Sequence, residues 1–119
     1  MTIENKELLL KDLCARLPYG VKVDYNNCAY EVLSIDKYNE ELTIWEIPGY
    51  YPDVRLEEVK PYLFPMSSMT MEQAQQWHKY ANDRGGLAPS TDWLNKNHFD
   101  YRGLIEKGLA IDATGKNIY

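Results

Sequence analysis

Apolar side chains recur at helical spacing in the first part of the chain, over residues 4–17. The positions that follow the i, i+3, i+4, i+7 pattern are Leu10, Leu13, Cys14 and Leu17. Pro18 cannot continue a helical hydrogen-bond ladder, and Gly20 tolerates the left-handed conformation that often ends a helix. The pattern therefore predicts an amphipathic N-terminal helix.

Strand-like alternation follows the helix. The predicted strands are 21–25, 30–36, 41–47 and a short segment at 54–56. The third strand is apolar on both sides, since Leu42 and Ile44 alternate with Trp45 and Ile47. Apolar residues on both sides are typical of a central strand that is covered on both faces.

The pattern changes character after residue 57. Residues 58–65 contain two prolines among apolar groups, which predicts an ordered connector with a helical turn. Thr70 and Gln73 have the spacing of a capping box and predict a helix from Met71 to about Asp83, which ends at Arg84-Gly85-Gly86. Shorter elements are expected beyond it: helical turns at 91–94 and 101–107 and an edge strand at 109–111.

These elements predict an α+β fold with an N-terminal helix, a small antiparallel sheet of three to five strands and a C-terminal helical half. An SH3-like, partly open barrel is the expected curvature of the sheet. The predicted division of the chain is 1–63, helix plus sheet, and 64–119, the helical half, packed together as one unit.

The charge distribution limits the classes of partner. The formal net charge is −5, and the acidic excess lies entirely within residues 1–63, which hold seven Lys and Arg against twelve Asp and Glu. No stripe of basic residues is present to neutralise phosphates, so nucleic acid is an unlikely partner. An acidic face either meets a basic partner protein or only aids solubility, and solubility is the more common reason.

The two cysteines, Cys14 and Cys28, have no CxxC neighbour and are interpreted as reduced thiols in a cytoplasmic protein. The N-terminal residues lack the basic and apolar regions of a signal peptide. No apolar run approaches the length of a membrane span, so no membrane association is expected.

No motif predicts a catalytic centre, a cofactor or a metal. His78 and His98 lack partners at the spacing of a zinc site. Ser67 and Ser68 precede a helix, where capping explains them, and Gly85-Gly86 follows a helix instead of opening one, which excludes a phosphate cradle. We therefore expect no catalytic, cofactor-binding or metal-binding residues, and the prediction leans against an enzyme.

The stretch from Asp92 to Ile105 combines aromatic and polar residues and is the candidate interaction patch. Its proposed members are Trp93, His98, Asp100, Tyr101 and Arg102. The alternative is a compact helical hairpin in which the aromatic residues form a core, and that interpretation is the more common one for a small fold.

Two stretches carry a resemblance to known sequences. One is Leu13-Cys14-Ala15-Arg16-Leu17-Pro18-Tyr19-Gly20-Val21-Lys22-Val23. The other runs from Lys60-Pro61-Tyr62-Leu63 through Pro65-Met66-Ser67-Ser68-Met69-Thr70 and on through Asp92-Trp93-Leu94 to Leu109-Ala110. Together they resemble a family of small uncharacterised proteins from anaerobic gut bacteria and their phages or prophages. The resemblance implies a cytoplasmic accessory protein carried by mobile elements, and it implies no activity and no functional residues.

Three functions stay open at this point. The first is a non-catalytic protein-interaction module with an unidentified protein partner. The second is a module that binds single-stranded nucleic acid through aromatic residues. The third is an enzyme with a site near His98, Asp100 and Arg102, which requires these three side chains to converge on one pocket.

Overall fold

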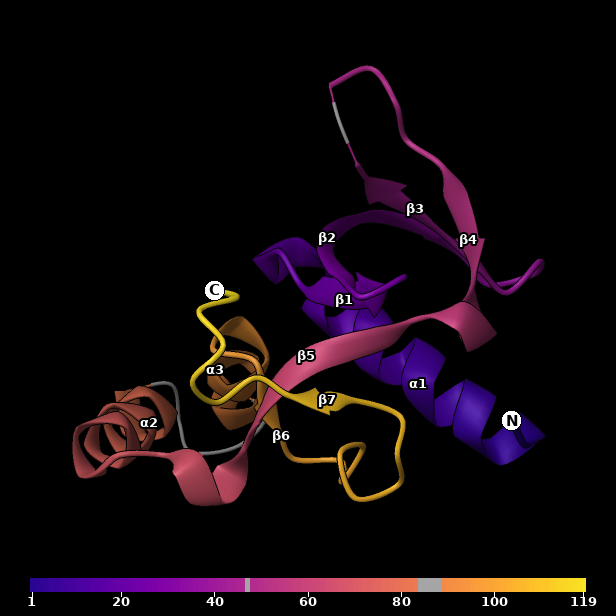
Figure 1. Cartoon of the computed structure of the whole chain (residues 1–119). Coiled ribbons are helices and arrows are strands. Elements are labelled where there is room, and N and C mark those ends of the chain that lie inside the picture. The colour runs from indigo at the N-terminus through magenta and orange to yellow at the C-terminus, as the bar shows by residue number, and fades with distance from the viewer. Residues whose placement is uncertain (47, 84–88) are drawn as a thin grey trace.

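The chain folds around one mixed sheet with three helices packed on and beside it (Figure 1). The computed structural model describes residues 1–46, 48–83 and 89–119. The helices are α1 (Ile3–Arg16), α2 (Met71–Asp83) and α3 (Pro89–Lys96), and the short 3-10 turns are η1 (Leu17–Tyr19), η2 (Leu56–Glu58) and η3 (Met66–Ser68). The strands are β1 (Lys22–Tyr25), β2 (Cys28–Asp36), β3 (Glu41–Trp45), β4 (Asp53–Arg55), β5 (Lys60–Pro65), β6 (Phe99–Asp100) and β7 (Ile111–Asp112).

The predicted N-terminal helix is confirmed as α1, but its buried face is rotated from the expected one. Thr2 caps it by accepting a hydrogen bond from the Asn5 amide at 3.1 Å. The buried positions are Leu9, Asp12, Leu13 and Arg16. These positions also follow helical spacing. The buried face of α1 therefore contains two charged residues, Asp12 and Arg16, together with its leucines.

The sheet has seven strands in the order β4-β3-β2-β1-β5-β6, with β7 also paired to β5. The pairs β1–β2, β2–β3, β3–β4 and β1–β5 are antiparallel, whereas β6 and β7 each lie parallel to β5. The prediction of a small antiparallel sheet of three to five strands, and of an SH3-like barrel, is therefore wrong. The second half is also not purely helical, since it contributes β6 and β7.

The extra strands lack the signals by which strands are recognised in a sequence. β5 contains Pro61 and Pro65, and proline weakens a strand prediction because it cannot donate to a ladder. β6 and β7 have two residues each, too short to show alternation. β7 nevertheless lies at Ile111–Asp112, next to the edge strand expected at 109–111.

The main hydrophobic core contains residues from both halves of the chain. Leu9 and Leu13 of α1 pack with Val23 and Ile44 of the sheet, and the same cluster includes Leu104 and Leu109 near the C-terminus. A second cluster, formed by Trp93, Leu94 and Phe99, lies beside α2 and α3. The expected boundary between residues 63 and 64 falls within β5, which pairs with strands from both parts.

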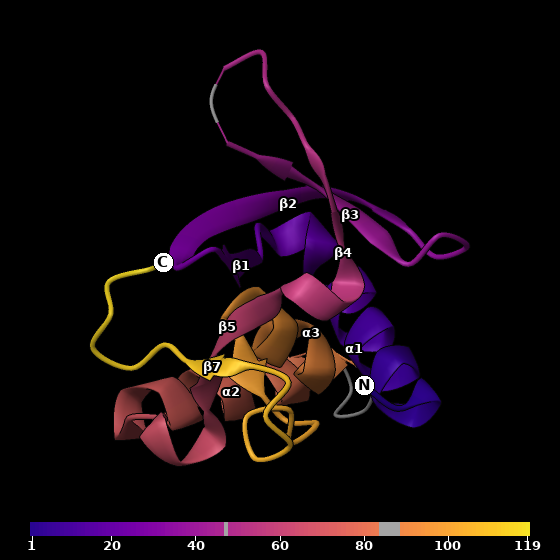
Figure 2. The same ribbon diagram turned by 45° about the vertical axis from the view of Figure 1, so that its right-hand side comes forward.

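The C-terminal segment returns across the sheet to the junction of β1 and β5 (Figure 2). The β1–β5 register pairs Val23 with Pro61, so the next opposed pair would be Lys22 with Tyr62. The Tyr119 hydroxyl joins these two residues, because it accepts from the Lys22 amide at 2.9 Å and donates to the Tyr62 carbonyl at 2.8 Å. A side-chain hydroxyl thus takes the place of a ladder hydrogen bond.

Two expectations fall on residues that are not described. The predicted helix end at Arg84-Gly85-Gly86 and the apolar position Ile47 lie outside the described residues.

The bridging hydroxyl generates a prediction about stability. Tyr119→Phe keeps the ring but leaves the Lys22 amide and the Tyr62 carbonyl without this partner, and we expect a loss of about 0.5–1.5 kcal/mol in the free energy of unfolding. Urea denaturation followed by circular dichroism measures the change. Tyr38→Phe is the matched control, because Tyr38 is fully exposed; equal stability of both variants would contradict the bridging role.

Candidate functional site

The predicted interaction patch is mostly buried within the protein. Trp93, His98 and Asp100 are 7%, 6% and 8% exposed, and Tyr101 and Arg102 are half-buried. The first three side chains therefore offer little surface to a partner. Their contacts show what they do inside the fold.

Arg102 belongs to a buried ionic network that begins on α1. The two carboxylate oxygens of Asp12 accept from different arginines, Oδ2 from Arg16 at 2.9 Å and Oδ1 from Arg102 at 2.7 Å. Asp12 and Arg16 are fully buried. Arg16 also donates to the carbonyls of Leu94 at 3.5 Å and Phe99 at 2.6 Å. This network fastens α1 to the C-terminal part of the chain.

Asp100 and Tyr101 are also used structurally. The Asp100 carboxylate accepts from the backbone amides of Leu104 at 3.0 Å and Ile105 at 2.9 Å, as a capping residue does. The Tyr101 hydroxyl donates to the Asn95 side chain at 2.9 Å. Its ring centroid lies 4.5 Å from the Arg102 guanidinium carbon and 5.5 Å from that of Arg16, so it covers the cationic side of the network.

His98, Asp100 and Arg102 do not converge on one pocket. Asp100 is bonded to backbone amides, Arg102 is paired with Asp12, and His98 lines a cavity to which neither of the other two contributes. General acid–base chemistry needs groups within hydrogen-bond reach of one substrate position. This arrangement gives no support to a catalytic site made from these three residues.

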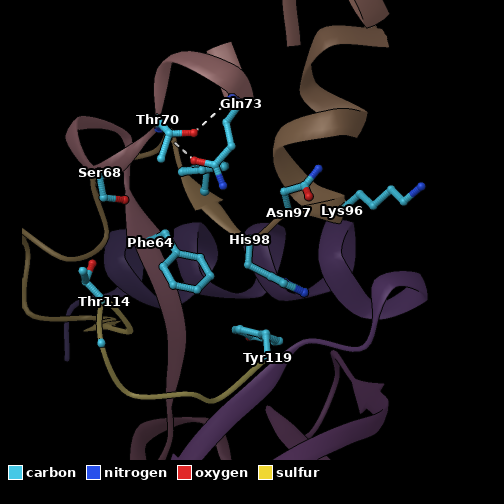
Figure 3. Close-up of a pocket in the computed structure, with 11 residues that line it drawn as sticks. Phe64, Ser68, Thr70, Gln73, Lys96, Asn97, His98, Thr114 and Tyr119 are labelled. Atoms are coloured by element: carbon cyan, nitrogen blue, oxygen red, sulfur yellow. Dashed lines mark hydrogen bonds between the residues drawn. The ribbon is translucent and has the colours of Figure 1, made fainter. Parts of the chain in front are cut away.

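The cavity at His98 measures about 490 Å³ and lies between the N-terminal end of α2, the end of α3 and the C-terminal segment (Figure 3). Phe64, Phe99 and Tyr119 supply aromatic surface, and Lys96 is the charged residue among the described residues that line it. The His98 ring stacks on Tyr119 with centroids 3.7 Å apart. Its Nδ1 is buried and has no hydrogen-bond partner among the described residues.

The polar groups of this cavity are largely committed to the backbone. The Ser68 hydroxyl donates to the Pro65 carbonyl at 2.7 Å, and Thr70 and Gln73 form a reciprocal capping box at the start of α2 (Figure 3). Within the described ranges, no group of three or more His, Cys, Asp or Glu side chains could hold a metal ion. The cavity therefore combines aromatic surface with the His98 Nδ1 atom and the Lys96 side chain.

A second region, the β3–β4 hairpin, projects from the body of the protein on the side away from α2 and α3 (Figures 1 and 2). The hydrogen bonds from the Ile44 amide to the Pro52 carbonyl and from the Glu46 amide to the Tyr50 carbonyl continue the β3–β4 register beyond Thr43–Asp53. Trp45 therefore lies opposite Tyr51. Both are exposed, by 47% and 52%.

Trp45 and Tyr51 lie on the face of the sheet that points away from the core. Val32, Ile44 and Val54 are buried on the inner face, and the residues that alternate with them point outward. We call the outward set the outer face; it consists of Glu31, Leu33, Thr43, Trp45, Tyr51 and Asp53. Leu33 points outward by alternation with Val32 and is 42% exposed, and the bulge that follows brings Ser34 opposite Thr43 and returns Ile35 to the inner face.

The acidic charge of the protein gathers on the same hairpin. Residues 40–58 contain six Asp and Glu and one Arg, a formal charge of −5, which equals the net charge of the whole chain. Two of these acids are neutralised at the base of the hairpin, since Lys6 lies 3.0 Å from Glu40 and 2.9 Å from Glu57. The Glu57 carboxylate has its pKa lowered chiefly by its hydrogen bond with Lys6. Of the other four acids, Glu41 lies opposite Arg55 at the base and Glu58 follows β4 in η2, whereas Glu46 and Asp53 lie further along the hairpin.

Sequence reasoning placed Trp45 inside a doubly covered central strand and so missed the outer face. β3 does lie between two strands, and Leu42 and Ile44 are buried, but Trp45 faces outward. The sequence does contain a signal for this arrangement. Thr43 and Trp45 alternate with Leu42 and Ile44, which indicates that Trp45 lies on the face opposite the apolar one. Pro48-Gly49 is followed by Tyr50 and Tyr51, as in a hairpin that extends beyond the core.

Comparison with known proteins gave no match to a protein-family model, to a curated protein or to a solved structure. No helix in the described parts of the chain is long and apolar enough to cross a membrane.

The buried network generates a stability prediction. Asp12→Asn removes the charge that compensates Arg16 and Arg102, and we expect a loss of about 3–5 kcal/mol in the free energy of unfolding, because the fully buried Arg16 and the half-buried Arg102 both lose their ionic partner. Glu7→Gln, at an exposed position of the same helix, is the control. Chemical denaturation compares the two, and a loss under about 1 kcal/mol for Asp12→Asn would contradict the role of the network.

His98 generates a prediction about pH. Burial first, and then the positive charges of Arg16 and Lys22, lower the pKa of His98 from 6.5 to about 4. Between these values the unfolded chain binds more protons than the folded one, so the free energy of unfolding falls as the pH falls from 6.5 to 4, by about 3 kcal/mol in all.

The variant His98→Asn tests this assignment. Asparagine tolerates the positive φ of 62° at this position but does not titrate. We expect the pH dependence between 6.5 and 4 to shrink in His98→Asn and to persist in His78→Asn, whose side chain is exposed on α2. An unchanged pH profile in His98→Asn would show that another group is responsible.

Proposed function

We propose that this chain is a non-catalytic protein-binding module whose contact surface is the outer face of the β3–β4 hairpin and β2. The observation that carries the proposal is the exposed Trp45–Tyr51 pair on a projecting hairpin. Large aromatic side chains dominate binding energy at protein interfaces, since they bury much apolar area and lose little side-chain entropy on binding.

The local structure supports a preformed surface. β3 is hydrogen-bonded on both sides, to β2 and to β4, and Thr43 donates to Asp53 across the outer face at 2.6 Å. Lys6 ties the base of the hairpin to α1 through Glu40 and Glu57. A surface that is already ordered loses less entropy when a partner docks.

The proposed cellular context is the cytoplasm, as an accessory protein carried by a phage or another mobile element. The unpaired state of Cys14 and Cys28 supports a reducing compartment. The mobile-element context depends on the sequence resemblance alone.

The acidic character of the hairpin argues against the alternative of single-stranded nucleic acid. Modules of that kind combine stacking aromatic rings with a positively charged groove. Here the exposed aromatic pair lies in the segment that carries the whole formal charge of −5, so phosphates would approach carboxylates.

A capture experiment with matched variants tests the proposal. The tagged protein and the variant Trp45→Ala/Tyr51→Ala are used to recover partners from a lysate of an anaerobic gut bacterium, with mass spectrometry and a nucleic-acid stain of the eluate. We expect a stoichiometric protein partner that is reduced about tenfold or more by the variant, because interface aromatic residues commonly act as hot spots.

The control is Tyr38→Ala/Met71→Ala, which removes two exposed side chains, 100% and 78% accessible, outside the outer face. It should retain the partner. Equal recovery with both variants, or an eluate with nucleic acid and no partner protein, would contradict the proposal. Circular dichroism of each variant confirms that the fold is retained.

A further inference from the structure

A small hollow lies at the inner end of the outer face, beside Trp45. It measures about 280 Å³ and is lined by Lys22, Ala29, Tyr30, Glu31, Trp45 and Glu46. We call it the Trp45 hollow. Its volume lies just below the range for small-molecule pockets, about 300–1,000 Å³, which suits one side chain of a partner better than a cofactor.

The strand register explains why these residues meet. Glu31 pairs with Lys22 of β1 on one side and with Trp45 of β3 on the other, and Trp45 is opposed by Tyr51. One row of side chains thus crosses four neighbouring segments of the sheet, with a carboxylate directly beside the exposed indole. Opposed side chains in such a row are about 5 Å apart at Cβ, close enough to contact one ligand group together.

The carboxylates at the hollow are available, unlike those at the base of the hairpin. Among the described residues, no ion pair involves Glu31 or Glu46, whereas Glu40 and Glu57 are both paired with Lys6. The pKa of Tyr30 is raised by burial and by Cys28, with a further contribution from the negative charge of Glu46. Glu46 therefore lies close enough to Tyr30 for its charge to act on that phenol.

The described residues that line the hollow include one basic residue, Lys22, and its ammonium group is bound by the C-terminal segment. The Lys22 ammonium donates to the Ile118 carbonyl at 2.9 Å and lies 6.0 Å from the centroid of the Tyr119 ring. The C-terminal segment thus engages this ammonium group, and the Glu31 carboxylate and the Trp45 indole lie opposite each other beside it.

We propose that the Trp45 hollow receives an arginine or lysine side chain from a basic segment of the partner protein. This inference rests on the proposed function and specifies the chemistry of the partner. A guanidinium or ammonium group is attracted by the face of an indole and by carboxylates; Glu31 lies opposite Trp45 on the outer face, and Glu46 adds negative charge at the edge of the hollow. The acidic charge of residues 40–58 would favour the approach of a basic segment.

Defined peptides test the inference by fluorescence anisotropy at low ionic strength. The probes are three labelled peptides of equal length that alternate serine with arginine, with glutamine or with glutamate. We expect the arginine peptide to bind and the other two to bind at least about tenfold more weakly, since only the first offers cations. Added salt should weaken the arginine complex.

Three variants locate the binding. Trp45→Ala and the charge-neutral Glu31→Gln/Glu46→Gln should each weaken the arginine peptide about tenfold or more, because each removes one part of the cation site. The matched control, Glu72→Gln/Glu106→Gln, removes two exposed acids of the second half and changes the net charge equally. It should leave the affinity nearly unchanged.

Two results would overturn the inference. One is the absence of any preference for the arginine peptide over the glutamine peptide. The other is an equal loss of affinity in the control and in the Glu31→Gln/Glu46→Gln variant, which would show attraction by net charge alone. If the peptides fail while a captured partner still depends on Trp45 and Tyr51, the protein-binding function stands and only the basic chemistry of the partner is rejected.

Discussion

The carboxylate of Asp12 is the contact on which much of the structure depends, because it holds two arginines that come from distant parts of the chain. Arg16 lies one helical turn away, whereas Arg102 follows β6, and Arg16 in turn reaches the carbonyls around α3 and β6. Burying three charges is costly unless each is paired and hydrogen-bonded, and here each one is. These ion pairs and hydrogen bonds hold α1 against the C-terminal part of the chain. The Tyr101 ring covers the two guanidinium groups. Apolar side chains at this position could contribute similar stability. Hydrogen bonds and ion pairs are directional, however, so they restrict the orientation of α1 more tightly.

β5 plays the corresponding role in the sheet. It is antiparallel to β1 and parallel to β6 and β7, so it joins an antiparallel meander to strands supplied by the second half. The main core is likewise built from both parts of the chain, because leucines near the C-terminus pack with leucines of α1. The hairpin is the exception: its distal part extends beyond this shared core, and its aromatic residues remain exposed there. A folded body and a projecting contact surface are thus separated within one small protein.

The sequence predicted well those elements whose signals are local. Thr70 and Gln73 announced α2 through their capping box, Gly20 marked the end of the first helical segment, and alternation located β1 to β3. It failed where a contact is made over long range. Nothing in two residues, Phe99 and Asp100, signals a parallel strand, and the prolines of β5 pointed to a connector. The candidate patch shows the same limit: Asp100 and Arg102 resemble recognition residues in sequence, and only the fold reveals that their charges are already bonded inside the protein.

The hydroxyl of Tyr119 joins the end of the described chain to β1, across 97 positions of sequence. Ends of protein chains usually fray at little cost, because few contacts hold them. Here displacement of the last two residues would also release the ammonium of Lys22, uncover the face of His98 and remove the hydroxyl that bridges β1 and β5. These residues thus add contacts to the strands that they bridge, and their local opening would weaken one end of the β1–β5 pair.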